Sequence, residues 1–116
     1  MPEKQTIMVV DDDPNIAQLV KLYLEKEGFE VTVETRGDDA VAAFQKNPPS
    51  LMLLDIMLPG MDGWQVCRAV RQTSSIPIIM LSAKDETFEK KEYISGIIMV
   101  IMIISFRTKR PRIARI

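Results

Sequence analysis

The 116-residue sequence contains no histidine and only one cysteine, Cys67. Without histidine the chain lacks the usual general base at neutral pH and the commonest protein ligand of zinc. A single cysteine excludes an internal disulfide and fits a reducing, cytoplasmic location. Aromatic residues are also scarce, at 6%, although a hydrophobic fraction of 47% suits one small domain with a single core. Any chemistry must therefore use carboxylates, hydroxyls and lysines.

The sequence also lacks a signal peptide, because no apolar stretch of sufficient length follows its first four residues. Its net charge of −1 hides an uneven distribution: residues 107–116 carry five basic residues and no acid. The whole chain has 15 basic and 16 acidic residues, so residues 1–106 carry 10 and 16, a charge of −6. We therefore expect an acidic domain at 1–106 and a basic tail at 107–116. Such a tail gives only salt-sensitive, sequence-blind attraction to nucleic acid, so direct DNA binding by this chain is not expected.

Apolar patterning predicts four strands, at residues 6–10, 30–35, 50–54 and 77–81, with a helix between each pair. The continuous run at 50–54 is typical of a buried central strand, whereas the alternation at 30–35 indicates an exposed face or a sheet edge. This alternation of strands and helices implies a parallel α/β sheet with right-handed crossovers.

The predicted helices have recognisable ends and apolar stripes. Asp13 or Asn15 can cap the first helix and Gly28 ends it, while Pro48-Pro49 stops the second. The predicted core stripes of the first and third helices are Ile16, Leu19, Val20, Tyr23 and Leu24, and then Trp64, Cys67 and Val70. For Trp64 the alternative to the core is a partly exposed anchor.

Polar residues follow three of the predicted strands where each one ends. Asp11, Asp12 and Asp13 follow the first strand, Asp55 the third and Ser82 the fourth. Because the carboxyl ends of parallel strands share one edge of the sheet, these side chains can converge on one pocket. Crowded carboxylates repel unless a cation neutralises them, and Mg²⁺ favours carboxylates together with phosphate oxygens. The sequence thus predicts metal-assisted phosphate chemistry.

Three segments, VVDDDPN, LLDIMLPGMDGW and PIIMLSAKD, resemble the receiver domain of two-component response regulators. The resemblance is strong over residues 7–84 and weaker to about residue 89. It implies a flavodoxin-like (CheY-like) three-layer α/β sandwich with five parallel strands in the order 2-1-3-4-5.

The resemblance also assigns roles to individual residues. Asp55 resembles the phosphoacceptor, which takes a phosphoryl group from a sensor histidine kinase. Asp12 resembles the direct Mg²⁺ ligand, with Asp11 beside it acting through water, and the backbone carbonyl of Met57 would add another metal oxygen. Ser82 would donate a hydrogen bond to the phosphoryl group. Such a module is not a turnover enzyme, although it assists its own phosphorylation and dephosphorylation.

The segment DIMLPGMDGW is similar to the corresponding segment of receivers joined to winged-helix DNA-binding domains. We therefore expect this chain to be the N-terminal part of a transcriptional regulator. One other reading stays open, a phosphorylation-incompetent receiver that would act only by binding proteins. A phosphohydrolase of the haloacid dehalogenase kind would need a second acid two residues after its nucleophile. This chain has Met57 there, which argues strongly against that enzyme class.

The resemblance ends near residue 90. The family's phosphate-binding Lys would fall near Ile104, and no Lys-Pro motif appears. A shifted reading frame could explain this, because codons for residues 105–110 read one base later can give Pro-Phe-Glu-Pro-Lys. Alternatively the terminus is a divergent one, in which 97–104 forms the fifth strand and Arg107 or Lys109 supplies a cation.

A membrane anchor is the least favoured explanation of this C-terminal segment. Residues 94–106 are too few to cross a bilayer, which takes ~17–25 residues, and they have no polar face for interfacial binding. An uncovered apolar run of this kind favours pairing between copies, so homodimers are expected.

Overall fold

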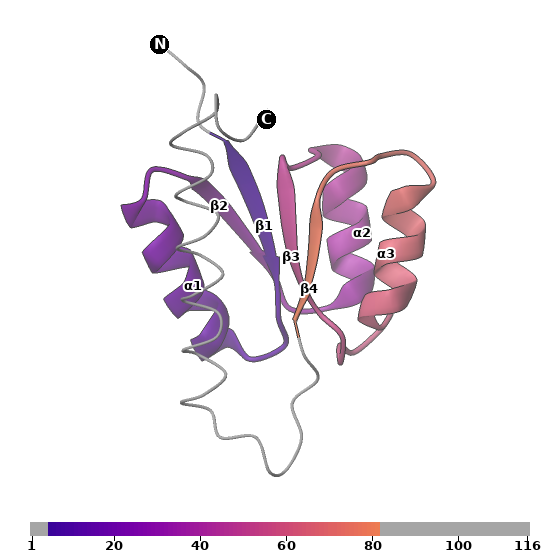
Figure 1. Cartoon of the computed structure of the whole chain (residues 1–116). Helices are drawn as coiled ribbons and strands as arrows, with labels where there is room; N and C mark the ends of the chain where they lie inside the picture. Colours follow the sequence, from indigo (N-terminus) through magenta and orange to yellow (C-terminus); the bar gives the residue numbers. More distant parts are fainter. Residues whose placement is uncertain (1–4, 82–116) are drawn as a thin grey trace.

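The computed structural model describes residues 5–81, and these form a parallel sheet with helices on both faces (Figure 1). The strands are β1 (Thr6–Val10), β2 (Glu30–Glu34), β3 (Leu51–Asp55) and β4 (Ile78–Leu81). The helices are α1 (Pro14–Lys26), α2 (Gly37–Lys46) and α3 (Gly63–Arg71). Strands and helices alternate along the chain, as the apolar patterning predicts.

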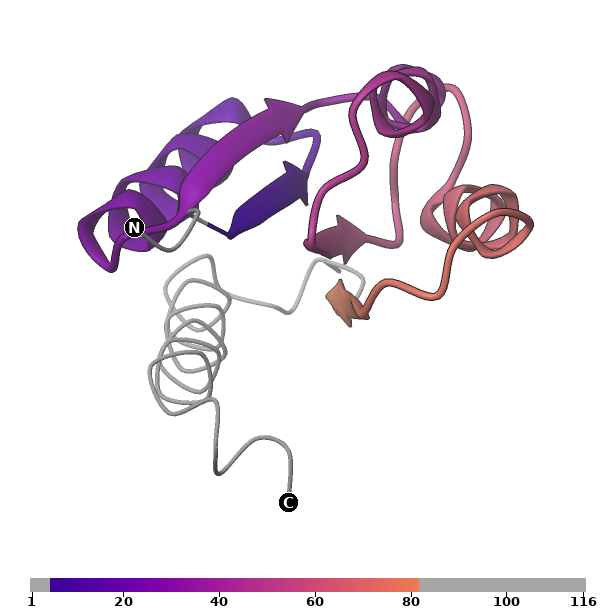
Figure 2. The same ribbon diagram turned by 90° about the horizontal axis from the view of Figure 1, so that it is seen from above.

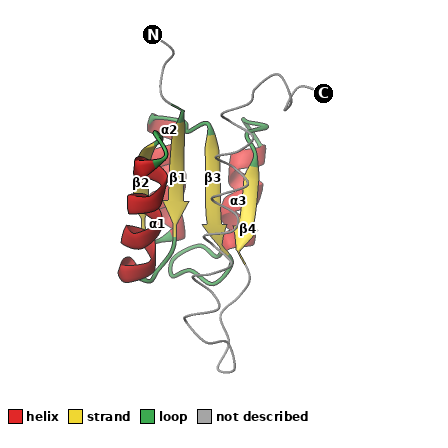
Figure 3. Cartoon of the chain, turned by 60° about the vertical axis from the view of Figure 1, so that its left-hand side comes forward, coloured by secondary structure: helices red, strands yellow, loops and turns green. Residues whose placement is uncertain are grey.

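The strand order is β2-β1-β3-β4, and every neighbouring pair is parallel. Viewed from above, α1 lies on one face of the sheet, while α2 and α3 lie on the other (Figure 2). All four strands point the same way, so their carboxyl ends meet at one edge (Figure 3). This is the predicted order 2-1-3-4. The predicted fifth strand falls outside the described residues.

Alternating side chains of β1 and β3 supply two separate hydrophobic layers, one on each side of the sheet. One layer packs beneath α1 and contains Ile7, Val9, Leu53, Ile16, Val20 and Leu24. The other packs beneath α2 and α3 and contains Met8, Val10, Met52, Leu54, Ala40, Phe44, Val66 and Val70. Because both faces of β1 and β3 are covered, the two central strands form a rigid base for the residues that follow them.

Local capping fixes where the helices start and stop. The Asp13 side chain accepts hydrogen bonds from the backbone N–H groups of Asn15 (2.9 Å) and Ile16 (3.3 Å), which confirms its predicted role as a cap of α1. Gly28 follows α1 with a φ of +97°, in the left-handed region that glycine adopts most easily. Asp62 and Gln65 form a capping box at the start of α3.

Some predictions of burial are wrong in detail. Tyr23 is exposed, and Ala17 instead lies in the buried face of α1. Trp64 is 53% exposed and Cys67 is only partly buried, because α3 turns Val66 and Val70 toward the sheet. Strand β4 is partly exposed except at Leu81. Over residues 5–81, no helix has both the length and the apolar character needed to span a bilayer; the 94–106 segment falls outside the described part.

Candidate metal and phosphoacceptor site

Three carboxylates converge at the carboxyl edge of the sheet. Across the ladder Val10 is level with Leu54, so Asp11 and Asp55 come side by side at the ends of β1 and β3. Asp12 joins them, and one carboxylate oxygen from each of the three acids lies within 4.8 Å of the other two. The predicted convergence of the strand-end acids is therefore present in the structure.

The three acids differ in exposure. Asp11 is 1% exposed and Asp55 is fully buried, whereas Asp12 is exposed to solvent. The N–H of Asp13 donates to Oδ1 of Asp11 at 2.9 Å, and the N–H of Asp11 donates to the Glu34 carbonyl at 3.1 Å. Asp11 is thus fixed through both its side chain and its backbone. The cluster has two rigid buried acids and one that is open to solvent.

Such an arrangement suits a small divalent cation. Carboxylates held close together in a protein interior repel one another, and a cation that accepts oxygen ligands offsets that repulsion. Mg²⁺ is bound through a few carboxylates and keeps several of its waters, so it needs a site open on one side. The exposure of Asp12 provides that opening. The donor set therefore fits Mg²⁺ in number and chemistry.

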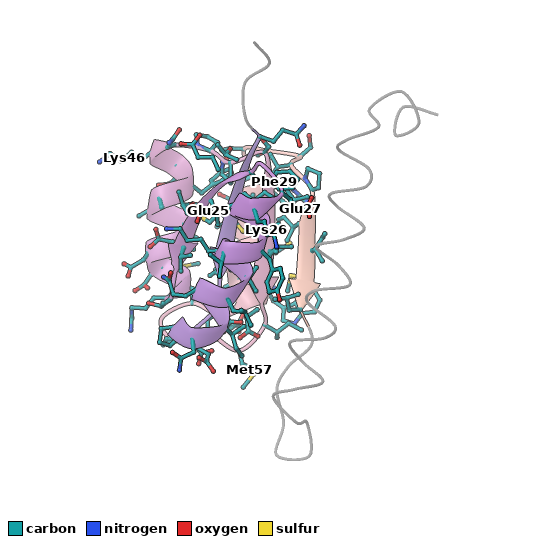
Figure 4. All side chains as sticks on the ribbon, turned by 90° about the vertical axis from the view of Figure 1, so that its left-hand side faces the viewer. Glu25, Lys26, Glu27, Phe29, Lys46 and Met57 are labelled. Atoms are coloured by element: carbon teal, nitrogen blue, oxygen red, sulfur yellow. The ribbon has the colours of Figure 1, made fainter. Side chains whose placement is uncertain are left out.

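The segment after Asp55, the β3–α3 loop at residues 56–62, is held at both of its ends. The N–H of Met57 donates to Oδ1 of Asp55 at 3.3 Å, and the N–H of Gly63 donates to the Ile56 carbonyl at 2.8 Å. The Met57 side chain is 60% exposed and projects at the opposite end of the molecule from Lys46 (Figure 4). The loop thus turns back on itself directly beside the acidic cluster.

Gly63 makes this tight turn possible. A Cβ atom built at this position would run into the backbone carbonyl of Asp55 and would lie 2.8 Å from the Cα atom of Ile56. A side chain at this position would therefore push the start of α3 away from the end of β3. Gly63 is therefore required by a close approach of two backbone segments as well as by the turn.

Another acid, Glu34, ends β2, and its backbone carbonyl accepts the N–H of Asp11. Partial burial, and then the charge of Asp39, raise the pKa of the Glu34 carboxyl above its ordinary value. This edge of the sheet is therefore a region of accumulated negative charge. The other two predicted positions, Ser82 and the expected phosphate-binding Lys near Ile104, lie outside the described residues.

Comparison with known proteins places this chain in a family. The family model described as the response regulator receiver domain matches residues 7–103, which extends beyond the motifs at 7–84. The DNA-binding response regulator MtrA of Mycolicibacterium smegmatis is 46% identical over 86 residues, and that of Mycobacterium tuberculosis is 45% identical over 86 residues. Each match covers 74% of this chain but only 38% of the relative.

Solved structures agree with this relationship. The beryllium fluoride-activated N-terminal receiver domain of Klebsiella pneumoniae RstA is 38% identical, with a TM-score of 0.66 and coverage of 78% of each chain. The chemotaxis response regulator CheY4 of Vibrio cholerae is 31% identical, with a TM-score of 0.67 and coverage of 82% of this chain and 81% of that one. The chain therefore belongs to the response regulator receiver domain family.

Proposed function

We propose that this receiver domain accepts a phosphoryl group on Asp55 from a sensor histidine kinase, with Mg²⁺ held by the acidic cluster. The observation that carries this proposal is the convergence of Asp11, Asp12 and Asp55 at one sheet edge in a chain of this family. Asp55 is fully buried at the end of β3, a central strand, where packing restrains its carboxylate.

In this reaction an oxygen of the Asp55 carboxylate attacks phosphorus. The bond from phosphorus to the imidazole nitrogen of the kinase histidine breaks, and an aspartyl phosphate forms. Bound Mg²⁺ would neutralise negative charge on the phosphoryl oxygens as they approach the acids. Asp12 and the Met57 carbonyl would hold the ion directly, and Asp11 would hold it through water.

Ser82 would donate a hydrogen bond to the phosphoryl group. Support comes from the preceding residue, because Leu81 is level with Asp55 across β3 and β4. The domain transfers one phosphoryl group to itself and is restored by hydrolysis, so it acts as a signalling intermediate in the cytoplasm and not as a turnover enzyme. Its state would shift the balance between two conformations that differ in affinity for a partner.

The output of the whole protein is part of the same proposal. The curated relatives are DNA-binding response regulators, and this chain spans less than half of their length. We therefore propose that residues 1–106 act as the receiver of a transcriptional regulator, with residues 107–116 as a basic tail, and that homodimers form. DNA binding would belong to the output domain of such a protein and not to this chain.

Incubation of the full chain with acetyl phosphate and Mg²⁺, followed by intact-mass measurement, tests the acceptor. We expect a gain of one phosphoryl group in the unaltered chain and in Asp13→Asn, and no gain in Asp55→Asn. Asp13→Asn is a matched control because it removes a neighbouring carboxylate yet keeps a good helix cap. No gain in a folded, unaltered chain would refute phosphorylation and leave a receiver that acts only by binding proteins.

A further inference from the structure

An ion pair at the start of α2 packs against the loop that follows the phosphoacceptor. Nε of Arg36 donates to Oδ1 of Asp38 at 3.1 Å, and Nη2 of Arg36 donates to Oδ2 of the same carboxylate at 3.1 Å. This two-pronged geometry restrains both side chains more than a single contact would. The side chains are 47% and 48% exposed, so the pair lies on the surface and not in the core.

The helix itself helps to hold the pair. Asp38 occupies the first turn of α2, where the helix dipole favours an acid, and its Oδ1 accepts the N–H of Asp39 at 3.0 Å. The hydrogen bond from Arg36, more than any other cause, lowers the pKa of Asp38 below its ordinary value. The pair is therefore ionised at neutral pH and is anchored to the end of a helix.

The pair lies directly on the backbone of Gly60. A Cβ atom built at Gly60 would be 2.6 Å from Oδ1 of Asp38 and 2.9 Å from Nη2 of Arg36. Gly60 also has a φ of +81°, so glycine is favoured here by both conformation and space. A side chain at this position would therefore have to displace the Arg36 and Asp38 side chains.

Gly37, between the two charged residues, adds a second attachment. Its N–H donates to the Pro59 carbonyl at 3.1 Å, and its Cα packs against the carbonyl of Met61. Residues 36–38 therefore contact residues 59–61 through side chains and backbone together. The ends of the β3–α3 loop are fixed near Asp55, and this contact fixes its outer turn.

We propose that Arg36 and Asp38 form a clasp that positions the β3–α3 loop and thereby sets the affinity of the acidic cluster for Mg²⁺. The inference rests on the proposed function, because it concerns the ligand carbonyl of Met57, which this loop carries. Neither member of the clasp belongs to the acidic cluster of Asp11, Asp12 and Asp55. Both are positioning residues: their side chains pack on Gly60, while the N–H of Gly37 between them holds the Pro59 carbonyl.

The direction in which two substitutions change the Mg²⁺ affinity distinguishes this role from a simple effect of charge. Arg36→Met removes a positive charge, so the electrostatic field alone would tighten Mg²⁺ binding. Asp38→Asn removes a negative charge, so the field alone would weaken it. Loss of the clasp weakens binding in both cases, because either change breaks the same contact. We expect each variant to raise the Mg²⁺ dissociation constant about two- to fivefold, the range for an exposed ion pair.

The experiment is a calorimetric titration of the full chain with Mg²⁺, combined with amide exchange of the Gly37 N–H by NMR. The double variant Arg36→Met/Asp38→Asn should be no weaker than either single variant, and all three should exchange the Gly37 proton faster. Asp39→Asn is the matched control, because it removes the same charge one residue along α2 and leaves both hydrogen bonds between Arg36 and Asp38 intact. It should leave the exchange rate of the Gly37 proton unchanged. It should weaken Mg²⁺ binding only as the loss of one negative charge predicts.

The possible failures are distinguishable. Opposite signs for Arg36→Met and Asp38→Asn, or unchanged affinity in both, would overturn the clasp while leaving the Mg²⁺ site in place. An unaltered chain that binds no Mg²⁺ would overturn the proposed function and the clasp with it. Tighter binding by both variants would also overturn the clasp, because it would mean that the pair holds the loop away from the ion.

Discussion

Replacing Asp55 by Asn should stabilise the folded chain in EDTA and remove most of its stabilisation by Mg²⁺. The reason is the crowding of charge at the sheet edge. Two unit charges no more than 4.8 Å apart repel by at least about 3.5 kcal/mol at an effective dielectric constant of about 20. Each carboxylate spreads its charge over two oxygens and solvent screens Asp12, so we expect a gain of about 1–3 kcal/mol in the free energy of unfolding.

Mg²⁺ should offset this difference in stability. At 100 times its dissociation constant, a ligand that binds only the folded state adds about 2.7 kcal/mol. The unaltered chain should gain this amount, whereas Asp55→Asn, which lacks one of the clustered acids, should gain much less. The difference between the two proteins should therefore shrink or change sign when Mg²⁺ replaces EDTA.

Urea unfolding measures this directly, with the fluorescence of Trp64, the single tryptophan, as the probe and circular dichroism as a second one. Asp13→Asn is the control, since it removes a carboxylate from the same run while asparagine still caps α1. It should keep the full response to Mg²⁺. Destabilisation of Asp55→Asn in EDTA, or an equal response of both variants to Mg²⁺, would refute the reasoning.

Three further predictions concern the frame around the site. Asp62→Ala breaks the capping box of α3 and should lower stability by about 1 kcal/mol in urea unfolding, whereas Asp62→Asn should lose less. Gly63→Ala places a methyl group against the backbone at the end of β3; it should destabilise the fold by about 2 kcal/mol or more and weaken Mg²⁺ binding, and wild-type values for both would contradict the close approach. Glu34 has a pKa raised by burial and by Asp39, so its ionisation disfavours the folded state as pH rises through the ordinary value of 4.5. Glu34→Gln should therefore be more stable than the unaltered chain at pH 7, and the difference should vanish below pH 4; a constant difference across that range would exclude this cause.

Much of the fold could be predicted from the apolar patterning of the sequence. The continuous apolar run 51–54 has to be covered on both faces, and only a central parallel strand flanked by helices achieves this. Parallel register then brings the residues after β1 and β3 to the same edge. The meeting of Asp11 with Asp55 was predictable for this reason, since it depends on strand direction and not on side-chain detail.

Helix rotation was harder to predict. The spacing of Trp64, Cys67 and Val70 suits an apolar stripe, but Val66 and Val70 form an equally good pair at four-residue spacing. The capping box fixes the start of α3 at the Asp62 position, which turns Trp64 outward. Periodicity alone does not choose between two stripes that overlap, whereas cap geometry does.

The contact of Arg36 and Asp38 with Gly60 has only a partial signal in the sequence. Its partners lie far apart in the chain, at the start of α2 and in the β3–α3 loop, and each one alone looks like ordinary turn or surface chemistry. The useful hint was Gly60 itself, because a glycine after proline marks a turn with a positive φ. What packs against such a turn depends on how two neighbouring crossovers meet, and that is a property of the assembled fold.

The run Asp11-Asp12-Asp13 shows that identical neighbours need not be interchangeable. One side chain is buried, the next faces solvent within the cluster, and the third caps α1. Deleting any one of them would leave two carboxylates for three positions: the buried acid, the exposed acid of the cluster and the cap of α1. Either the helix would lose its cap or the cluster would lose an acid. Such a deletion would hardly alter the composition of the chain. In comparisons of related proteins, alignment gaps at this run are therefore more informative than the number of acids in it.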